Sequence, residues 1–318
     1  MSSLASSHDA ALICGSLAYD NIMVFPDRFR NHILPEQIHI LNVSFLVPEM
    51  RREFGGCAGN IAYNLHLLGG SPRIVATVGD DFAPYRARLE GFGIPLDRVR
   101  HVENTLTAQA FITTDLDGNQ ITAFHPGAMN FSHQNRVEPG EARLGIVSPD
   151  GREGMLQHAR DFVAAKIPFI FDPGQGLPMF SGEEVLAFFD MADYACFNDY
   201  EARLASERAG LSIERLSERV EALIITHGGE GSGIWTGGER INIPCARAEA
   251  VLDPTGCGDA YRAGLLYGLL AGFDWRKTGQ LASLMGAIKI AQYGSQNHAP
   301  TPDAINAQYR REFGENLW

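Results

Sequence analysis

Short apolar runs alternate with helical patterns along most of the chain. The first run, Ala10 to Cys14, ends at Gly15 and has the length of a buried strand. The residues from Ala58 to Leu68 place apolar side chains at helical spacing between two glycine pairs. Further strands are expected at 73–78, 146–147, 169–171, 194–197 and 223–226, and further helices at 161–165, 183–190, 200–209 and 213–220. This alternation predicts an α/β fold with right-handed βαβ units and a mostly parallel sheet covered on both faces.

Two segments depart from this alternation. Residues 21–53 contain three prolines and lack helical periodicity, and residues 107–128 hold two β-rich runs joined through Asp117-Gly118, which is a hairpin signal. We interpret them as a small β lid over the carboxyl edge of the sheet, where ligands bind in open α/β folds. The large domain would then consist of residues 10–20, 54–106 and 129–318.

Composition restricts the partners. The formal net charge is −12, which disfavours polymeric nucleic acid and anionic membranes as partners. Any phosphate must therefore be held locally. The five cysteines are scattered and form no C-x-x-C pair, which disfavours a disulfide framework or a zinc site. The polar N-terminus has no basic region followed by an apolar core, so we expect a cytoplasmic protein.

The run Asp253-Pro-Thr-Gly-Cys-Gly-Asp259 has the clearest chemical meaning, because the usual P-loop and G-x-G-x-x-G fingerprints are absent. Gly256, Cys257 and Gly258 precede an apolar helical pattern, so their backbone amides would form an anion hole at a helix start. A carboxylate in that first turn suits a general base beside a transferred phosphoryl group. Asp259 is also a common helix-start residue, and both interpretations remain open from spacing alone.

A second group combines Asp20 with the run Gly55-Gly56-Cys-Ala-Gly-Asn60. The glycines let a ligand approach the backbone, and the carboxylate and amide could bind vicinal hydroxyls. A turn aspartate and a capping asparagine are the more common explanation of these two residues taken alone.

Two further groups follow strands. Asn198-Asp-Tyr-Glu201 could organise hydrated Mg²⁺, or it could be a helix N-cap with acidic residues in the first turn. Thr226-His-Gly-Gly-Glu-Gly-Ser-Gly233 is a glycine-rich turn that could follow a nucleotide or be a plain loop.

In this order along nearly the whole chain, the motifs resemble the ribokinase-like, or PfkB, family of sugar and nucleoside kinases. The run 253–259 is close to the family's D-[TP]-T-G-A-G-D signature, with Cys257 in place of the usual alanine. The resemblance implies a ribokinase-like three-layer fold with a β-sheet lid. It also implies ATP and Mg²⁺ as cofactors.

The resemblance also implies roles for individual residues. Asp259 would be the base, and the amides of Gly256, Cys257 and Gly258 the anion hole. The expected substrate contacts are Asp20, Gly55, Gly56, Asn60, Phe111, Phe124, Asp172 and Gln175. Asn198 and Glu201 would act on Mg²⁺ through water, and Thr226, Gly228 and Gly231 on ATP. Asp253 and Thr255 match a site for a monovalent cation such as K⁺, although residues 292–294 depart from the ribokinase pattern.

The runs 55–63, 122–129, 171–175 and 253–262 are most similar to the prokaryotic nucleoside kinase branch, whose members phosphorylate adenosine and often other nucleosides. The first hypothesis is therefore phosphorylation of the ribose 5′-hydroxyl in purine salvage. A ribokinase or fructokinase is the second, and a catalytically silent nucleoside-binding regulator the third. The extended lid is compatible with a homodimer, because its strand edges could be covered by a second copy.

Overall fold

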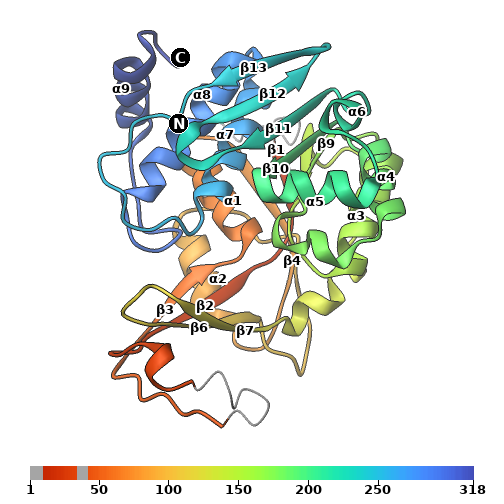
Figure 1. Cartoon of the computed structure of the whole chain (residues 1–318). Helices are drawn as coiled ribbons and strands as arrows, with labels where there is room; N and C mark the ends of the chain where they lie inside the picture. Colours follow the sequence, from red (N-terminus) through yellow and green to blue (C-terminus); the bar gives the residue numbers. More distant parts are fainter. Residues whose placement is uncertain (1–9, 34–41) are drawn as a thin grey trace.

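The computed structural model describes residues 10–33 and 42–318. In this part of the chain the main sheet has nine strands in the order β13-β12-β11-β10-β9-β8-β1-β4-β5 (Figure 1). They are β1 (Ala10–Cys14), β4 (Ser71–Val78), β5 (Val99–His101), β8 (Leu144–Val147), β9 (Phe169–Phe171), β10 (Tyr194–Asn198), β11 (Ala222–Thr226), β12 (Ser232–Thr236) and β13 (Glu239–Ile243). The strands from β5 to β11 pair in parallel, which confirms the mostly parallel sheet.

The edge formed by β12 and β13 is antiparallel and was not anticipated. Thr236 pairs with Glu239 across the two-residue turn Gly237-Gly238, a connection typical of β-hairpins. The glycine-rich run that follows β11 therefore leads into a hairpin that extends the sheet.

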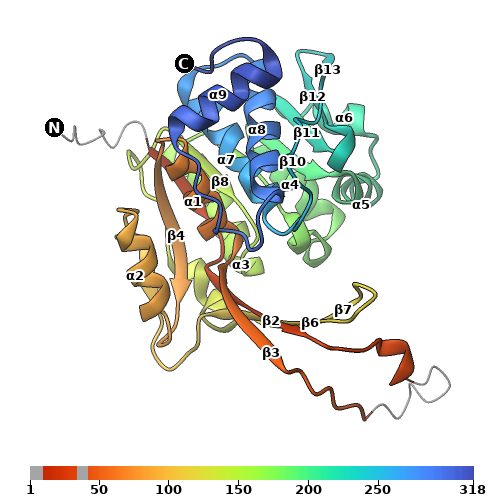
Figure 2. The same cartoon turned by 90° about the vertical axis from the view of Figure 1, so that its left-hand side faces the viewer.

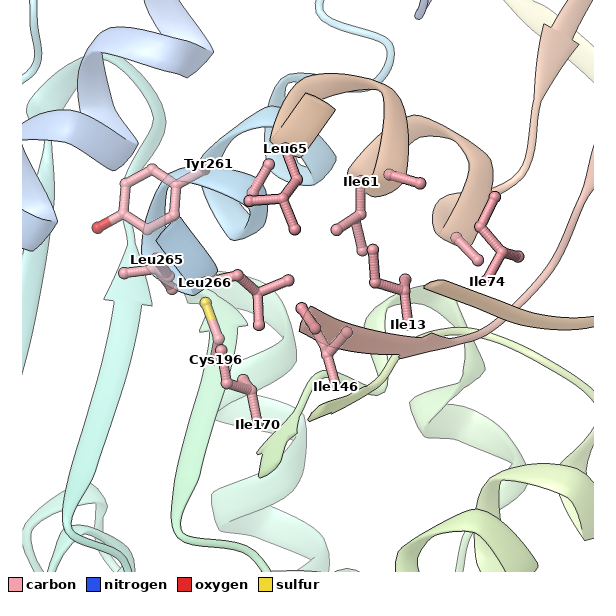
Figure 3. Close-up of a cluster of buried hydrophobic side chains, with 14 of the residues drawn as sticks. Ile13, Ile61, Leu65, Ile74, Ile146, Ile170, Cys196, Tyr261, Leu265 and Leu266 are labelled. Atoms are coloured by element: carbon pink, nitrogen blue, oxygen red, sulfur yellow. The ribbon is translucent and has the colours of Figure 1, made fainter. Parts of the chain in front are cut away.

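Helices cover both faces of the main sheet. Successive residues of a strand point to opposite faces, and in β1 the residues of both faces are buried. Ile13 of β1 packs in one cluster with Ile61 and Leu265 (Figure 3), whereas its neighbour Cys14 packs in a second cluster with Phe162. The helices are α1 (Cys57–Leu67), α2 (Ala83–Gly91), α3 (Arg152–Ala165), α4 (Gly182–Met191), α5 (Asp199–Ala209), α6 (Ile213–Ser217), α7 (Cys257–Ala271), α8 (Trp275–Ile290) and α9 (Pro302–Phe313). Short 3₁₀ turns are η2 (Phe29–Asn31), η4 (Gly127–Gln134), η5 (Gly174–Met179) and η6 (Gly228–Glu230).

Two helices differ in length from the expected segments. The α3 helix begins at Arg152, well before residue 161. Gly154 in its first turn lies against Ser132, and a Cβ on Gly154 would come within 2.0 Å of the Ser132 hydroxyl oxygen. The α6 helix ends at Ser217 rather than at residue 220. The Ser217 hydroxyl donates to the Glu214 carbonyl at 2.8 Å, a side-chain bond that competes with helix continuation.

A second sheet with the order β3-β2-β6-β7 projects from one end of the main body (Figure 2). Its strands are β2 (Ala18–Val24), β3 (Glu49–Gly55), β6 (Ala108–Thr114) and β7 (Gln120–His125). Residues 18–20 and 54–55 belong to this sheet, although the sequence analysis placed them in the large domain. The reason is that the chain passes from β1 to β2 through only three residues. Residues 34–41 of the expected lid lie outside the described residues.

None of the helices in the described ranges combines the length and apolar character that crossing a bilayer requires.

The crossing of α7 and α8 supports the helix that begins at the candidate anion hole, and Gly264 lies at this crossing. A Cβ there would come within 2.5 Å of the Ala282 Cα, so the two backbones would have to separate. We expect Gly264→Ala to lower the free energy of unfolding by about 1–3 kcal/mol, despite the better helix propensity of alanine. Chemical denaturation measures the change.

Gly91→Ala is the matched control. Gly91 is also in a helix, but a Cβ there meets no atom within 4 Å, so its stability should be unchanged or slightly higher. Equal effects of the two substitutions would contradict close packing at the α7–α8 crossing.

Candidate active site

A cavity of about 400 Å³ lies at the carboxyl edge of the main sheet. It is lined by Cys57, Pro149, Asp172, Gly174, Gln175, Asn198, Asp199, Tyr200, Glu201, Thr226, Gly228, Gly258, Asp259 and Arg262. The ends of β9, β10 and β11 and the start of α7 thus meet at one place, as expected for a ligand site in this class of fold. A wider depression of about 570 Å³ at the base of the lid, lined by Leu106 and His125 among others, contains none of the predicted residues.

The start of α7 has the geometry of an anion site with one difference from expectation. Gly256 is the N-cap with φ of 79°, a left-handed conformation that glycine adopts without strain. The Cys257 amide donates to the Pro254 carbonyl at 3.2 Å, so it is already engaged. The amides of Gly258 and Asp259 belong to the first turn, where a helix provides no carbonyl partners. They are the donors best placed to receive an anion.

Asp259 is the carboxylate at this helix start. Its Oδ2 accepts a hydrogen bond of 2.8 Å from Asn60 Nδ2. Burial raises the pKa of Asp259 to about 7, and the charge of Asp172 adds to this effect. The Asn60 hydrogen bond and the charge of Arg262 act in the opposite direction. A carboxylate with this pKa can take up a proton near neutral pH.

Asn60 is a buried residue of α1 whose side chain bonds to residues from the C-terminal part of the sequence. Its Oδ1 accepts from Gln296 Nε2 at 3.0 Å, and the same amide donates to the Tyr85 hydroxyl at 2.6 Å. Asn60 was predicted to contact a sugar, but its side chain is bonded to Asp259 and Gln296. Gln296 and Tyr85 carried no sequence signal, because they meet only in the folded chain.

Arg262 was present in the motif but had no assigned role. It follows Asp259 by three residues, so both lie on one face of α7. Its guanidinium forms two hydrogen bonds with Asp172, of 3.1 and 2.9 Å, and lies 4.0 Å from Glu201. Burial acts to lower the pKa of Arg262, but the nearby Asp172 and Glu201 carboxylates and the hydrogen bonds to Asp172 act together in the opposite direction, and the net effect raises this pKa. A fixed positive charge therefore lies in the cavity wall.

Asp20 lies in β2, at the junction of the lid and the main body. Burial, with the charges of Glu53 and Asp253, raises its pKa to about 6. A Cβ on Gly55 would come within 2.3 Å of its carboxylate, so only glycine allows this approach. Gly56 is restricted to glycine in the same way. Its φ is 84°, and a Cβ there would come within 2.6 Å of the Ser16 carbonyl oxygen.

The lid register separates the two candidate phenylalanines. Asp20 pairs with Ala110, and Ala110 pairs with Phe124, so Phe124 shares the face of the lid that carries Asp20. Phe111 is one residue further along β6 and therefore points to the opposite face. Both rings are exposed, Phe124 at 51% and Phe111 at 40%. The two rings were predicted to contact the substrate together, but they cannot both face a ligand next to Asp20.

Asn198 and Glu201 form a reciprocal capping box. Asn198 Oδ1 accepts from the Glu201 amide and Glu201 Oε2 accepts from the Asn198 amide, each at 2.8 Å. The capping interpretation is thus confirmed, and it does not conflict with a metal role. The carboxylates of Asp199 and Glu201 line the cavity, and this oxygen-rich wall fits a hydrated Mg²⁺ held mainly through its own water.

The predicted nucleotide-side residues are only partly brought together. Thr226 at the end of β11 and Gly228 in η6 line the cavity. Gly231 does not; its amide donates to the Gly228 carbonyl, and a Cβ would come within 2.2 Å of the Ile243 carbonyl oxygen. It is a turn residue packed against β13. Gln175 reaches the cavity and lies with Nε2 3.8 Å from Cys57 Sγ.

The residues matched to a monovalent-cation site have other partners. The Asp253 carboxylate accepts from the amides of Thr255 and Gly294, each at 2.9 Å. The Asp253 and Gln292 carbonyls accept from the ammonium of Lys289 at 2.8 and 3.0 Å. A side-chain cation thus already uses the carbonyl oxygens next to the predicted cation site, and the arrangement does not fit a bound metal ion.

Comparison with known proteins gives consistent relatives. Residues 20–302 match the pfkB family of carbohydrate kinases. A nucleoside kinase of Methanocaldococcus jannaschii is 34% identical over 268 residues, covering 83% of this chain and 88% of that protein. The structure of Burkholderia thailandensis nucleoside kinase in complex with inosine is 54% identical and has a TM-score of 0.89, covering 96% of this chain and 99% of that one. The same protein in complex with ADP-inosine has a TM-score of 0.86, with 55% identity and coverage of 96% and 97%.

The match extends over most of the chain, and the similarity in fold includes both the main body and the lid. The ordered motifs lie at the carboxyl ends of the strands and at the start of α7. This chain belongs to the pfkB family of carbohydrate kinases and is a phosphotransferase with an alcohol acceptor.

Proposed function

We propose that the protein is an ATP- and Mg²⁺-dependent kinase that phosphorylates the ribose 5′-hydroxyl of adenosine and of other nucleosides. The observation that carries the proposal is the position of the Asp259 carboxylate together with its raised pKa. It has a pKa of about 7 and lies in the first helical turn, beside amides that can receive a phosphoryl group. The relatives named nucleoside kinase, one of them in complex with inosine, support a nucleoside acceptor. The complex named ADP-inosine supports ATP as the donor.

Each residue has a defined task in this reaction. Asp259 takes the proton of the attacking hydroxyl, and Asn60 holds the carboxylate in position. The amides of Gly258 and Asp259 stabilise the charge that develops on the transferred group, and Arg262 adds a fixed positive charge nearby. Mg²⁺, when bound near Glu201, would neutralise the phosphates of the donor.

The lid supplies the acceptor contacts. Asp20 would bind ribose hydroxyls where Gly55 and Gly56 leave space, and Phe124 would stack on the base from the same face. Asp172 is already bonded to Arg262, so we assign it to shaping the pocket rather than to direct ligand binding. Gln175 remains a candidate for contact with the base.

A substrate panel tests the acceptor class. We expect ADP release with adenosine and inosine at rates at least about tenfold above those with ribose or fructose, because the exposed Phe124 offers a stacking surface that only a nucleoside uses. A preference for free sugars would favour the ribokinase or fructokinase hypothesis. A ligand-induced rise in melting temperature without any ADP release would favour the silent regulator.

Asp259→Asn tests the base. The variant keeps the shape of the side chain but cannot accept the proton, so kcat should fall by about 100-fold or more while nucleoside affinity changes little. Steady-state kinetics and calorimetry measure the two quantities.

The pH profile supplies the control for this assignment. In the parent, kcat/KM should fall as the pH drops through about 7, because protonation removes the base. The residual activity of Asp259→Asn should lack this step. Near-normal turnover by the variant, or the same profile in both proteins, would show that another group is the base.

Phe124→Ala and Phe111→Ala form a matched pair on the lid. Stacking of a base on an aromatic ring contributes about 1–3 kcal/mol, so Phe124→Ala should raise the KM for adenosine about tenfold. Phe111→Ala removes a similarly exposed ring from the opposite face and should change KM less than about twofold. Initial-rate measurements over a range of adenosine concentrations decide, and a larger effect at Phe111 would reverse the assignment.

A further inference from the structure

Lys289 is a fully buried lysine close to the candidate active site. It lies in the last turn of α8 and its exposure is 0%. Of the Arg and Lys residues that the structure describes, only Arg262 and Lys289 are buried. Burying an ammonium is costly unless its charge and its donors are satisfied, so this position calls for a physical explanation.

The contacts of Lys289 join two loops. Its Nζ donates to the Asp253 carbonyl at 2.8 Å and to the Gln292 carbonyl at 3.0 Å. The first carbonyl belongs to the segment that enters α7, and the second to the segment that leaves α8. The C-terminal end of α8 is also the end of a helix where a positive charge is favourable.

Asp253 strengthens the same connection through its side chain. The carboxylate accepts from the Thr255 amide within its own loop and from the Gly294 amide of the other loop. The Asp253 amide donates to the Ile290 carbonyl at 3.2 Å. Lys289 therefore lies at the centre of a clamp, defined here as residues 253–255 held against residues 289–294.

The clamp leads directly into the anion site. Only Pro254 and Thr255 separate Asp253 from Gly256, the N-cap of α7. The charge of Lys289 also acts on Cys257, the first residue of the helix, where it opposes the raised pKa of the thiol. Displacement of the clamp would move the amides that receive the phosphoryl group.

We propose that Lys289 is a positioning residue that replaces a bound monovalent cation, holding the anion site in place so that turnover does not require K⁺. A K⁺ ion coordinated here would need the carbonyl oxygens that the ammonium already uses. A lysine suits the task better than an arginine, because its ammonium is a compact point charge with three donors. The activity readout of this inference rests on the proposed kinase function.

The first experiment uses the parent protein and adenosine. ADP release and the midpoint of thermal unfolding are measured in KCl and in tetramethylammonium chloride at equal ionic strength. We expect the two salts to give rates within about twofold and the same unfolding midpoint. A several-fold higher rate in KCl, or a K⁺-specific rise in the midpoint, would overturn the proposal.

Variants test the lysine itself. Lys289→Met removes the charge with little change in volume, and we expect kcat to fall at least tenfold while the KM for adenosine stays within twofold. Lys289→Ala leaves space, so ethylammonium or K⁺ should restore part of its rate when tetramethylammonium does not. A merely structural role would not produce this rescue.

Lys277→Met is the control on the same helix, since Lys277 is only partly buried and its ammonium donates to the Asn316 carbonyl at 3.2 Å, away from the clamp. It should keep the parent rate.

Full activity of Lys289→Met would overturn the proposal, and so would the absence of rescue in a folded Lys289→Ala. If neither variant at position 289 folds, the salt comparison on the parent decides. If the parent releases no ADP with any acceptor, the proposed function fails, and the unfolding midpoints in the two salts still decide whether K⁺ binds.

Discussion

The hydrogen bond between Asn60 and Asp259 joins two helices whose residues are 199 positions apart. It brings the start of α1, which follows the lid, to the start of α7, which carries the anion site. Asp259 is buried enough for its pKa to reach about 7, yet it remains next to amides that can bind a phosphoryl group. The rest of the site is arranged around this carboxylate, through Gln296 and Tyr85 behind Asn60 and through Arg262 one turn along α7.

The distribution of charge explains how an acidic protein can handle phosphate. The chain has a net charge of −12, but its buried Arg262 and Lys289 both act near the first turn of α7. Each is compensated locally, Arg262 by Asp172 and Lys289 by two carbonyl oxygens. Fixed charges in a poorly hydrated site interact more strongly than surface charges and need no reorganisation during the reaction. The acidic surface is therefore compatible with a small phosphorylated ligand.

Close backbone approaches set the geometry at the lid. Gly55 lies against the Asp20 carboxylate, and Gly56 lies against the backbone that connects the two sheets. Because β2 and β3 begin and end at this junction, the lid and the main body meet at the residues proposed to bind the sugar. The register of β6 and β7 then determines which side chains face that junction.

The sequence by itself determined the alternation of strands and helices, the lid segments and the ordered motifs, because these depend on local spacing and on residues close together in the chain. It therefore pointed to the carboxyl edge of the sheet and to Asp259, which lines the cavity there. Only the tertiary structure decided that Asn60 bonds to Asp259, that Phe111 and Phe124 point to opposite faces, and that Gly231 is a turn residue. It also revealed the contacts of Arg262 and Lys289. These features arise from packing and strand register between distant segments, and local sequence patterns do not encode which distant groups will meet.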